Sequence, residues 1–129
     1  MTKVSIVLSA YNSEKFLKQA LESILNQSYK EFEFIIFDDA STDTTKNIIQ
    51  NFANKDARII AIYNDINKGL TRNLNKAISL AKGAYIARMD ADDISLSERL
   101  AMQVAFLESN RDISIIGTAL TEVNEAGEK

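Results

Sequence analysis

Hydrophobic and polar positions alternate along the chain in blocks that predict strands and helices in turn. Short apolar runs bounded by polar residues are typical of buried parallel strands. Between these runs, apolar residues recur at the three- and four-residue spacing of an amphipathic helix. The helices are expected to begin near residues 12, 45, 70 and 97, the last one continuing to about residue 110. The predicted strands are 4–9, 33–37, 58–63, 84–89 and 113–117.

This alternation predicts an α/β fold with a mostly parallel sheet and helices on both of its faces. The chain contains no internal repeat, no low-complexity segment and no proline or glycine-rich linker, so residues 1–129 are expected to form a single domain. Residues 118–123 predict one more strand, which leads into a turn at 124–128. We therefore expect a domain truncated at its C-terminal end, whose last strand is frayed or paired with another chain, as in a homodimer.

Polar residues and glycines mark the expected helix ends. The third helix is expected to bury one stripe, made of Leu70, Leu74, Ala77, Ile78 and Ala81, which leaves Arg72, Asn75 and Lys76 available to solvent or a ligand. Gly69 suits a turn with positive φ, and Gly83 is expected to end this helix. The predicted helix N-caps are Asn12 or Ser13 for the first helix, Ser41 and Asp43 for the second, and Ser95 or Ser97 for the fourth.

Polar segments follow the predicted strands directly. In a parallel α/β sheet, ligands gather at the carboxyl ends of the strands, near the point where the strand order reverses. We therefore expect these segments to line one cleft. The segments are 9–12, 38–39, 64–69 and 90–93, and the second and fourth carry neighbouring aspartates.

The composition limits the chemistry that such a cleft can perform. The 129 residues include no cysteine and no histidine, which removes thiolate nucleophiles and the commonest general base. Any metal must be bound by oxygen, which favours Mg2+ or Mn2+, and proton transfer is left to carboxylate, lysine or tyrosine. The net charge of -3, with scattered lysines and arginines, argues against a nucleic-acid partner.

The first nine residues are too few for a secretory signal or a membrane span, so the sequence predicts a cytoplasmic chain without a transmembrane segment. In a full-length protein, a peripheral position at the inner face of the membrane is also compatible with this reading.

Several nucleotide and metal motifs are excluded by particular residues. Residues 9–13 contain no glycine, which argues against a dinucleotide-binding fingerprint and a P-loop. Residues 90–101 fail as a calcium loop, because the sixth position is Ser95 and the twelfth is Ala101. A phospho-acceptor receiver domain would keep an acidic pair after its first strand, where this chain has Ser9.

Two acidic strand ends, with Lys68 and Arg72 nearby at a helix start, favour a site for a metal-bridged diphosphate. The alternative is that residues 90–93 are only a solvated loop before a helix N-terminus, where negative charge is favourable.

Four segments, in this order and spacing, are similar to the N-terminal half of a family 2 glycosyltransferase of the GT-A fold. They are 4–12 (VSIVLSAYN), 34–43 (FIIFDDASTD), 67–73 (NKGLTRN) and 83–93 (GAYIARMDADD). The resemblance covers nearly the whole chain, and the four segments together make it specific.

The resemblance implies a nucleotide-sugar donor held by seven residues. Ser9 and Tyr11 match positions against the nucleotide base, and Asp39 matches the acid that accepts from it, usually from the ring N–H of uracil. Asp90, Ala91 and Asp92 match the family's D-x-D motif, with Asp90 toward the ribose and Asp92 on a Mn2+ or Mg2+ ion that holds the diphosphate. Arg72 matches a basic position near the phosphates. Asp38 and Asp93 are left as supporting or capping residues.

The implied reaction transfers a sugar from a UDP-type donor to a saccharide or lipid-linked acceptor, with inversion at the anomeric carbon. In the family, the catalytic base lies later in the sequence than Lys129, so no catalytic residue is assigned and the fragment alone is expected to be inactive. The alternative is a noncatalytic nucleotide-binding or assembly module of the same fold.

Overall fold

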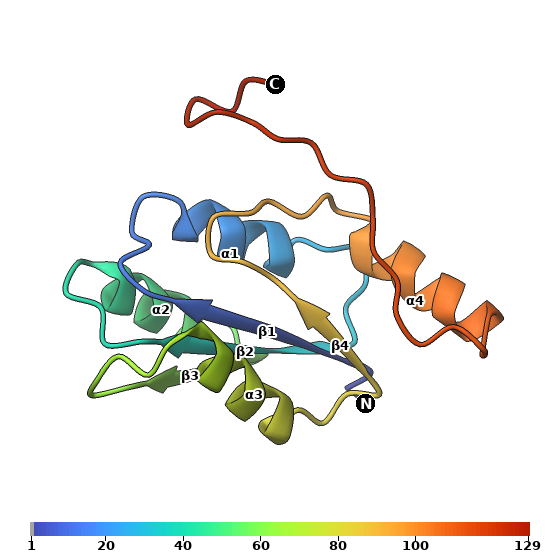
Figure 1. The fold of residues 1–129 in the computed structure, drawn as a ribbon, viewed down its shortest axis with the longest axis horizontal. Helices are drawn as coiled ribbons and strands as arrows, with labels where there is room; N and C mark the ends of the chain where they lie inside the picture. The colour runs from blue at the N-terminus through green and yellow to red at the C-terminus, as the bar shows by residue number, and fades with distance from the viewer. Residues whose placement is uncertain (1) are drawn as a thin grey trace.

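A four-stranded parallel sheet lies at the centre of the computed structural model, which describes residues 2–129 (Figure 1). The strand order is β3-β2-β1-β4, so the chain builds outward from β1 and then returns to its other side. The predicted strands 4–9, 33–37, 58–63 and 84–89 are confirmed to within one residue at each end. The elements are β1 (Val4–Ala10), α1 (Leu17–Leu25), β2 (Phe32–Asp38), α2 (Thr45–Ala53), β3 (Ile59–Tyr63), α3 (Leu70–Leu80), β4 (Tyr85–Arg88) and α4 (Arg99–Ser109).

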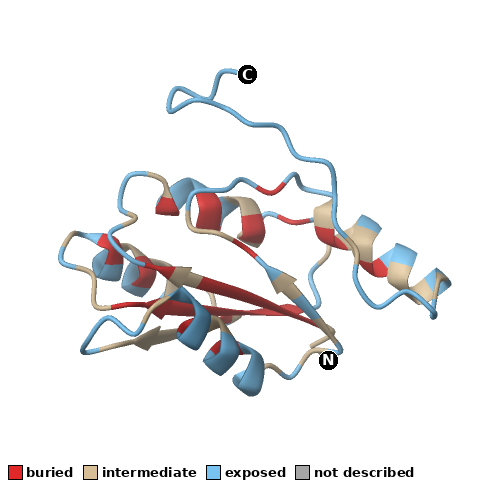
Figure 2. Cartoon of the chain, in the orientation of Figure 1, coloured by how far each residue is buried: buried red, intermediate tan, exposed pale blue. Residues whose placement is uncertain are grey.

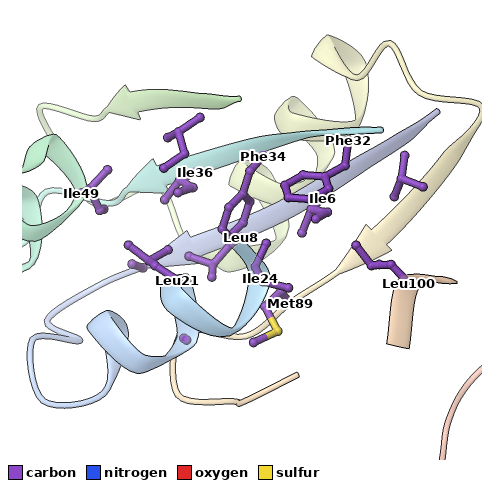
Figure 3. Packing of buried hydrophobic residues seen from close by; sticks show 14 of the residues in the cluster. Ile6, Leu8, Leu21, Ile24, Phe32, Phe34, Ile36, Ile49, Met89 and Leu100 are labelled. Atoms are coloured by element: carbon purple, nitrogen blue, oxygen red, sulfur yellow. The ribbon is translucent and has the colours of Figure 1, made fainter. Parts of the chain in front are cut away.

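Helices cover both faces of the sheet, as predicted. Successive side chains of a strand point to opposite faces, so an apolar strand offers a surface for helix packing on each face. On one face, Leu8 and Phe34 belong to a large core cluster that includes residues of α1, α2 and α4 (Figure 3). On the other face, Val7, Ile35 and Phe37 pack against α3. The buried positions concentrate in the two central strands (Figure 2). Burial on both faces explains why these strands have continuous apolar sequences.

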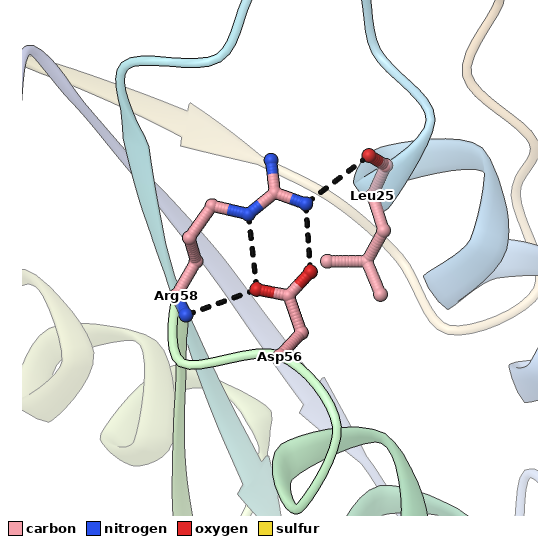
Figure 4. Close-up of polar contacts among 3 residues, drawn as sticks. All are labelled: Leu25, Asp56 and Arg58. Carbon is pink, nitrogen blue, oxygen red and sulfur yellow. Dashed lines mark hydrogen bonds and ion pairs between the residues drawn. The ribbon is translucent and has the colours of Figure 1, made fainter.

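An arginine ties the start of β3 to the end of α1 (Figure 4). Arg58 Nε donates to Asp56 Oδ1 at 3.0 Å, and Arg58 Nη2 donates both to Asp56 Oδ2 at 2.7 Å and to the carbonyl of Leu25 at 3.3 Å. The hydrogen bonds from Arg58 lower the pKa of Asp56 and outweigh the opposing effect of burial. The pair therefore fixes the edge strand against the helix layer.

Gly83 does not end α3, contrary to the prediction. The helix ends at Leu80, and Gly83 lies two residues beyond the extended residue Ala81. Its N–H donates to the Ser5 hydroxyl at 2.8 Å, and a Cβ placed on it would lie 2.5 Å from the Ser5 nitrogen. Gly83 is therefore required by the close approach of two backbones rather than by a positive φ.

Replacing Gly83 with alanine is expected to destabilise the fold by roughly 1–3 kcal/mol, because the new methyl group would overlap the backbone of residues 4 and 5. Urea unfolding measures this loss. Gly117→Ala is the matched control, since a Cβ at Gly117 meets nothing within 4 Å. Equal unfolding midpoints for the two variants would contradict this account of Gly83.

The predicted strands at 113–117 and 118–123 are wrong for the described structure. Both segments lack strand pairing, and Ile115 and Leu120 are 89% and 82% exposed. An apolar run becomes a strand only when a neighbouring strand takes its backbone hydrogen bonds. The ordered sheet within residues 2–129 ends at β4, which supplies no pairing to this segment.

Most of the predicted helix caps are also wrong. None of α1, α2 and α4 has a side-chain hydrogen bond from its N-cap residue, and these N-caps are Phe16, Thr44 and Glu98. Asn12 and Ser41 instead join the loops that follow β1 and β2, because Asn12 N–H donates to Ser41 Oγ at 3.0 Å. Asn12 Oδ1 in turn accepts from the N–H of Thr42. Ser13, Ser95 and Ser97 likewise make no cap. Asp43 does stabilise the start of α2, since its Oδ1 accepts from the N–H of Thr45 at 2.9 Å.

None of the helices in residues 2–129 combines the length and the apolar content that a membrane crossing requires.

Candidate functional site

A pocket of about 370 Å³ lies at the carboxyl ends of β1 and β4, the two strands between which the strand order reverses. Five residues singled out from the sequence line it: Ser9 near the end of β1, Tyr11 just after that strand, and Asp90, Ala91 and Asp92 after β4. The other lining residues are Asn12, which belongs to the predicted cleft segment 9–12, and Ser13, Phe16 and Leu70, which the sequence did not single out for the site. The predicted cleft segments 38–39 and 64–69 contribute no lining residue. The position agrees with the rule that α/β sheets bind ligands at the reversal of strand order.

Asp39 is outside the lining and is only 2% exposed. Its Oδ1 accepts from Asn64 Nδ2 at 2.9 Å and from the N–H of Lys68 at 2.8 Å, and its Oδ2 accepts from the N–H of Gly69 at 2.9 Å. Burial alone would raise the pKa of Asp39, but these hydrogen bonds together hold it below its ordinary value. Asp39 is therefore an ionised and oriented carboxylate at the end of β2.

Two asparagines, the partly buried Asn64 and the buried Asn73, connect Asp39 to the pocket. Asn64 Nδ2 also donates to Asn73 Oδ1 at 2.8 Å, and Asn73 Nδ2 donates to Ser9 Oγ at 3.0 Å. The sequence interpretation missed Asn73 because it placed Leu70 and Ile78 on the buried stripe, whereas both are about half exposed. The signal that could have identified it is a polar residue three positions after Leu70, at helical spacing from Ala77. Asn73 is 1% exposed.

Arg72 is exposed on α3 and is not among the residues that line the pocket. The structure thus places it on the helix that begins at the pocket, through Leu70, without bringing its side chain into the lining. Lys68 contributes its backbone N–H to Asp39, while its side chain is exposed.

The acidic loop, residues 90–93, concentrates negative charge beside the pocket. Arg88 Nη2 pairs with Asp90 Oδ1 at 3.1 Å, while Asp92 and Asp93 are exposed. Partial desolvation of its carboxyl group, followed by the charges of Asp90 and Asp92, raises the pKa of Asp93 above its ordinary value. A loop with this charge is suited to a cation.

Within residues 2–129, no group of three or more carboxylate, histidine or cysteine side chains could hold a metal ion by itself. Asp90 and Asp92 offer the oxygen ligands that Mn2+ and Mg2+ prefer. Mg2+ commonly takes only one or two carboxylates from a protein and completes its shell with water and phosphate oxygens. The residues present therefore fit a metal that is shared with a phosphate-bearing ligand.

Arg99, the first residue of α4, forms hydrogen bonds to residues on both sides of the acidic loop. Its Nη2 donates to the carbonyl of Arg88 at 2.9 Å, and its Nη1 donates to Ser95 Oγ at 2.9 Å. These two contacts bracket the loop, because Arg88 precedes residues 90–93 and Ser95 follows them. The guanidinium thus fixes the loop without entering the pocket lining.

Gln27, which follows α1 and is fully buried, holds the next segment. Its Nε2 donates to the carbonyls of Leu96 at 2.7 Å and Ser95 at 3.5 Å, and its Oε1 accepts from the N–H of Leu100 at 3.0 Å. The same region also receives the N–H of Ser28, which donates to the carbonyl of Ser97 at 2.9 Å. The end of α1 therefore positions the segment that carries the acidic loop.

Backbone strain occurs at the same edge of the sheet. Among the described residues, the non-glycine residues with positive φ are Asn12 at 45° and Ala40 at 61°. Each lies two residues beyond a strand, β1 for Asn12 and β2 for Ala40. An alanine in this conformation costs on the order of 1 kcal/mol, and such strain is common at ligand sites.

Comparison with known proteins gives a consistent result. A family model described as "Glycosyl transferase family 2" matches residues 5–128. Among curated proteins, the chain is 47% identical over 126 residues to "Putative glycosyltransferase EpsE" of Bacillus subtilis, covering 97% of this chain and 45% of that protein. It is 42% identical over 111 residues to the Escherichia coli protein "UDP-Glc:alpha-D-GlcNAc-diphosphoundecaprenol beta-1,3-glucosyltransferase WfaP", covering 86% of this chain and 43% of that protein. The chain thus spans less than half the length of these relatives.

Solved structures agree with the fold. The structure of S. aureus TarS 1-349 in complex with UDP-GlcNAc superposes with a TM-score of 0.79 at 31% identity, covering 85% of this chain and 32% of that one. The mannosyltransferase PcManGT from Pyrobaculum calidifontis, in complex with GDP-Man and Mn2+, gives a TM-score of 0.75 at 25% identity over 81% of this chain and 32% of that one. The four parallel strands and their helices therefore match the GT-A fold.

Proposed function

This chain belongs to glycosyltransferase family 2, and we propose that it is the nucleotide-sugar-binding domain of an enzyme that transfers a sugar from a UDP-sugar to an acceptor hydroxyl with inversion. The observation that carries the proposal is the pocket at the reversal of strand order. It brings the aromatic residue Tyr11 and the hydroxyl of Ser9 to the same place as Asp90 and Asp92. An aromatic face suits a nucleotide base, and carboxylates suit a metal-bound diphosphate.

We assign the base end to Ser9, Tyr11 and Asp39. Tyr11 is 51% exposed at the pocket, which leaves its ring available for stacking. Asp39 is held ionised by its hydrogen bonds and can only accept, which suits the ring N–H of uracil. The UDP-GlcNAc complex of TarS supports a uridine donor for this chain.

We assign the diphosphate end to Asp90, Ala91 and Asp92, with Arg72 nearby on α3. Asp92 and Asp90 would hold Mn2+ or Mg2+, an assignment supported by the Mn2+ in the PcManGT complex. When bound, the ion would offset the negative charge of the leaving diphosphate. The Arg88–Asp90 ion pair would have to open or share its carboxylate for Asp90 to act as a ligand.

The acceptor is proposed to be a saccharide or a lipid-linked saccharide. The name of WfaP, which describes transfer to a diphosphoundecaprenol-linked sugar, supports the lipid-linked class. Asp39 is already committed to three hydrogen bonds and Asp90 to an ion pair, so neither is assigned as the base that deprotonates the acceptor.

The proposal predicts that UDP binding strengthens when Mn2+ is added and that Asp92→Ala removes this gain. Loss of a carboxylate ligand should lower the affinity in Mn2+ by roughly tenfold or more, about 1.4 kcal/mol. Isothermal titration calorimetry with and without Mn2+ measures both quantities. Asp112→Ala, at an exposed acid after α4, is the matched control and should behave as the unmodified chain. UDP binding that is tight and independent of the metal would argue against the assignment.

A further inference from the structure

Four side chains form a continuous hydrogen-bonded chain under the pocket, here called the Asp39–Ser9 chain. It runs from Asp39 to Asn64, from Asn64 to Asn73, and from Asn73 to Ser9, with donor–acceptor distances of 2.9, 2.8 and 3.0 Å. Asp39 follows β2, Asn64 follows β3, Ser9 lies near the end of β1, and Asn73 lies on α3. Asp39 and Asn73 are 2% and 1% exposed, so solvent has little access to these two members of the chain.

The carboxylate fixes the direction of every hydrogen bond in the Asp39–Ser9 chain. An ionised carboxylate can only accept, so the amide nitrogen of Asn64 must face Asp39. The same nitrogen contacts Asn73, which must therefore present its amide oxygen to Asn64. The amide nitrogen of Asn73 is then left to donate to Ser9 Oγ. Each asparagine consequently has one possible amide orientation.

The Ser9 hydroxyl consequently accepts a hydrogen bond from Asn73, and its own proton is not used in that bond. Among residues 2–129, no other hydrogen bond to its side chain is formed. Ser9 also lines the pocket. Its O–H is therefore free to donate to a ligand in the pocket, while the lone pair engaged by Asn73 is not available to that ligand.

We propose that Asn64 and Asn73 are positioning residues that set base specificity by making Ser9 a hydrogen-bond donor to a carbonyl of the nucleotide base. This inference rests on the proposed function, in which Ser9 faces the base of a nucleotide-sugar donor. The Asp39–Ser9 chain presents the Ser9 hydroxyl to the pocket, while Asp39 is its buried end. Uracil matches a donor at Ser9, because both groups beside its ring N–H are carbonyl oxygens.

The direction of the hydrogen bond at Ser9 decides whether its proton can reach a uracil carbonyl, since one lone pair of the hydroxyl stays free to accept in either case. If Ser9 were turned to accept, it would face a uracil carbonyl with a lone pair, and both groups would be left unpaired in the pocket. Cytosine carries an amino donor where uracil has a carbonyl, so an accepting Ser9 would favour it. Reversing the last hydrogen bond of the Asp39–Ser9 chain should therefore change nucleotide preference without touching a residue that contacts the base.

Asn73→Asp makes this reversal. At pH 8 the new carboxylate can accept from Asn64 but cannot donate to Ser9, so the hydroxyl turns to donate to it. We expect UDP affinity to fall roughly 10- to 100-fold, and the preference for UDP over CDP to shrink by about tenfold or more. Calorimetric titration of UDP and CDP in Mn2+ measures both. Asn75→Asp makes the same chemical change at an exposed position of α3 and should leave the preference unchanged.

Combination with Ser9→Ala separates this effect from simple repulsion between the new charge and Asp39. Repulsion would persist when Ser9 is absent, whereas an effect transmitted through its hydroxyl would disappear. We therefore expect Asn73→Asp to leave the UDP-to-CDP preference unchanged in the Ser9→Ala background. Persistence of the preference change in that background would overturn the inference.

A nucleotide-free measurement tests the Asp39–Ser9 chain itself. In proton–nitrogen NMR spectra, the side-chain amide protons of Asn64 and Asn73 should be protected from exchange, and Ser9→Ala should shift only those of Asn73. If Asn73→Asp fails to fold, Ser9→Ala still tests the donor, because it should lower UDP affinity more than CDP affinity. UDP binding with an unchanged preference in Ser9→Ala and Asn73→Asp would overturn this inference alone. Protected asparagines in a protein that binds neither nucleotide would overturn the proposed function as well.

Discussion

Replacing Gln27 with leucine is expected to destabilise the fold by roughly 3 kcal/mol, because leucine fills the space but cannot form the hydrogen bonds. The carbonyl of Leu96 and the N–H of Leu100 would each lose a partner at 2.7 and 3.0 Å. Gln27 is fully buried, so water cannot replace the amide without opening the structure. Urea unfolding, followed by circular dichroism, measures the loss.

The same variant should weaken the metal-dependent part of UDP binding, since the segment that Gln27 holds carries the acidic loop. Gln19→Leu, at an exposed position of α1, makes the identical chemical change and should alter stability by no more than about 0.5 kcal/mol. A Gln27→Leu protein with the stability of the control would show that the carbonyl of Leu96 and the N–H of Leu100 find other partners.

The position of the candidate site was predictable because it depends only on strand order and direction. Parallel strands bring their carboxyl ends to one edge, so the acids at the ends of β2 and β4 lie on the same edge as the polar residues after β1. Segment 90–93 therefore pointed to the pocket before any side-chain contact was known, whereas Asp38 and Asp39 are buried and lie outside its lining. The lining by Ser9, Asp90 and Asp92 agrees with that expectation.

The residues that support the site were not predictable in the same way. Gln27 and Asn73 each stand beside other polar residues in the sequence, and their partners Leu96 and Ser9 are dozens of positions away. Local patterns describe spacing along one element, whereas these hydrogen bonds depend on how two elements pack. Gly83 was misread for the same reason, because its role depends on the backbone of β1 rather than on the end of α3.

The segment at 113–123 shows a further limit of pattern reading. Its apolar residues carry a strand preference, yet Ile115 and Leu120 are exposed and unpaired in the described structure. Strand formation requires partners as well as propensity, because an isolated strand leaves its backbone groups without hydrogen bonds. The sequence of this segment shows its strand propensity but does not identify a strand that could pair with it.

Replacing Asp39 with asparagine should cost roughly 3 kcal/mol at pH 7, although the two side chains have nearly the same shape. Three donors converge on the carboxylate, from Asn64, Lys68 and Gly69. If the oxygen of the new asparagine keeps the hydrogen bonds from Asn64 and Lys68, its NH2 group faces the N–H of Gly69. Two donors then point at each other with no acceptor between them. Gly69 begins α3 with φ of 88°, so the loss falls on the residue that starts this helix.

Asp38→Asn is the matched control for that loss, and pH provides the second test. Asp38 is as deeply buried, but its Oδ1 has no hydrogen-bond partner in the described chain, so removing its charge should cost much less. The pKa of Asp39 is lowered from an ordinary 3.8, so its stabilisation is present above that value and is lost as the pH falls through the lower folded value. The stability gap between the unmodified chain and Asp39→Asn, measured by urea unfolding, should therefore be full at pH 7 and narrow below about pH 4. A gap that stayed constant with pH would show that shape, not charge, makes Asp39 necessary.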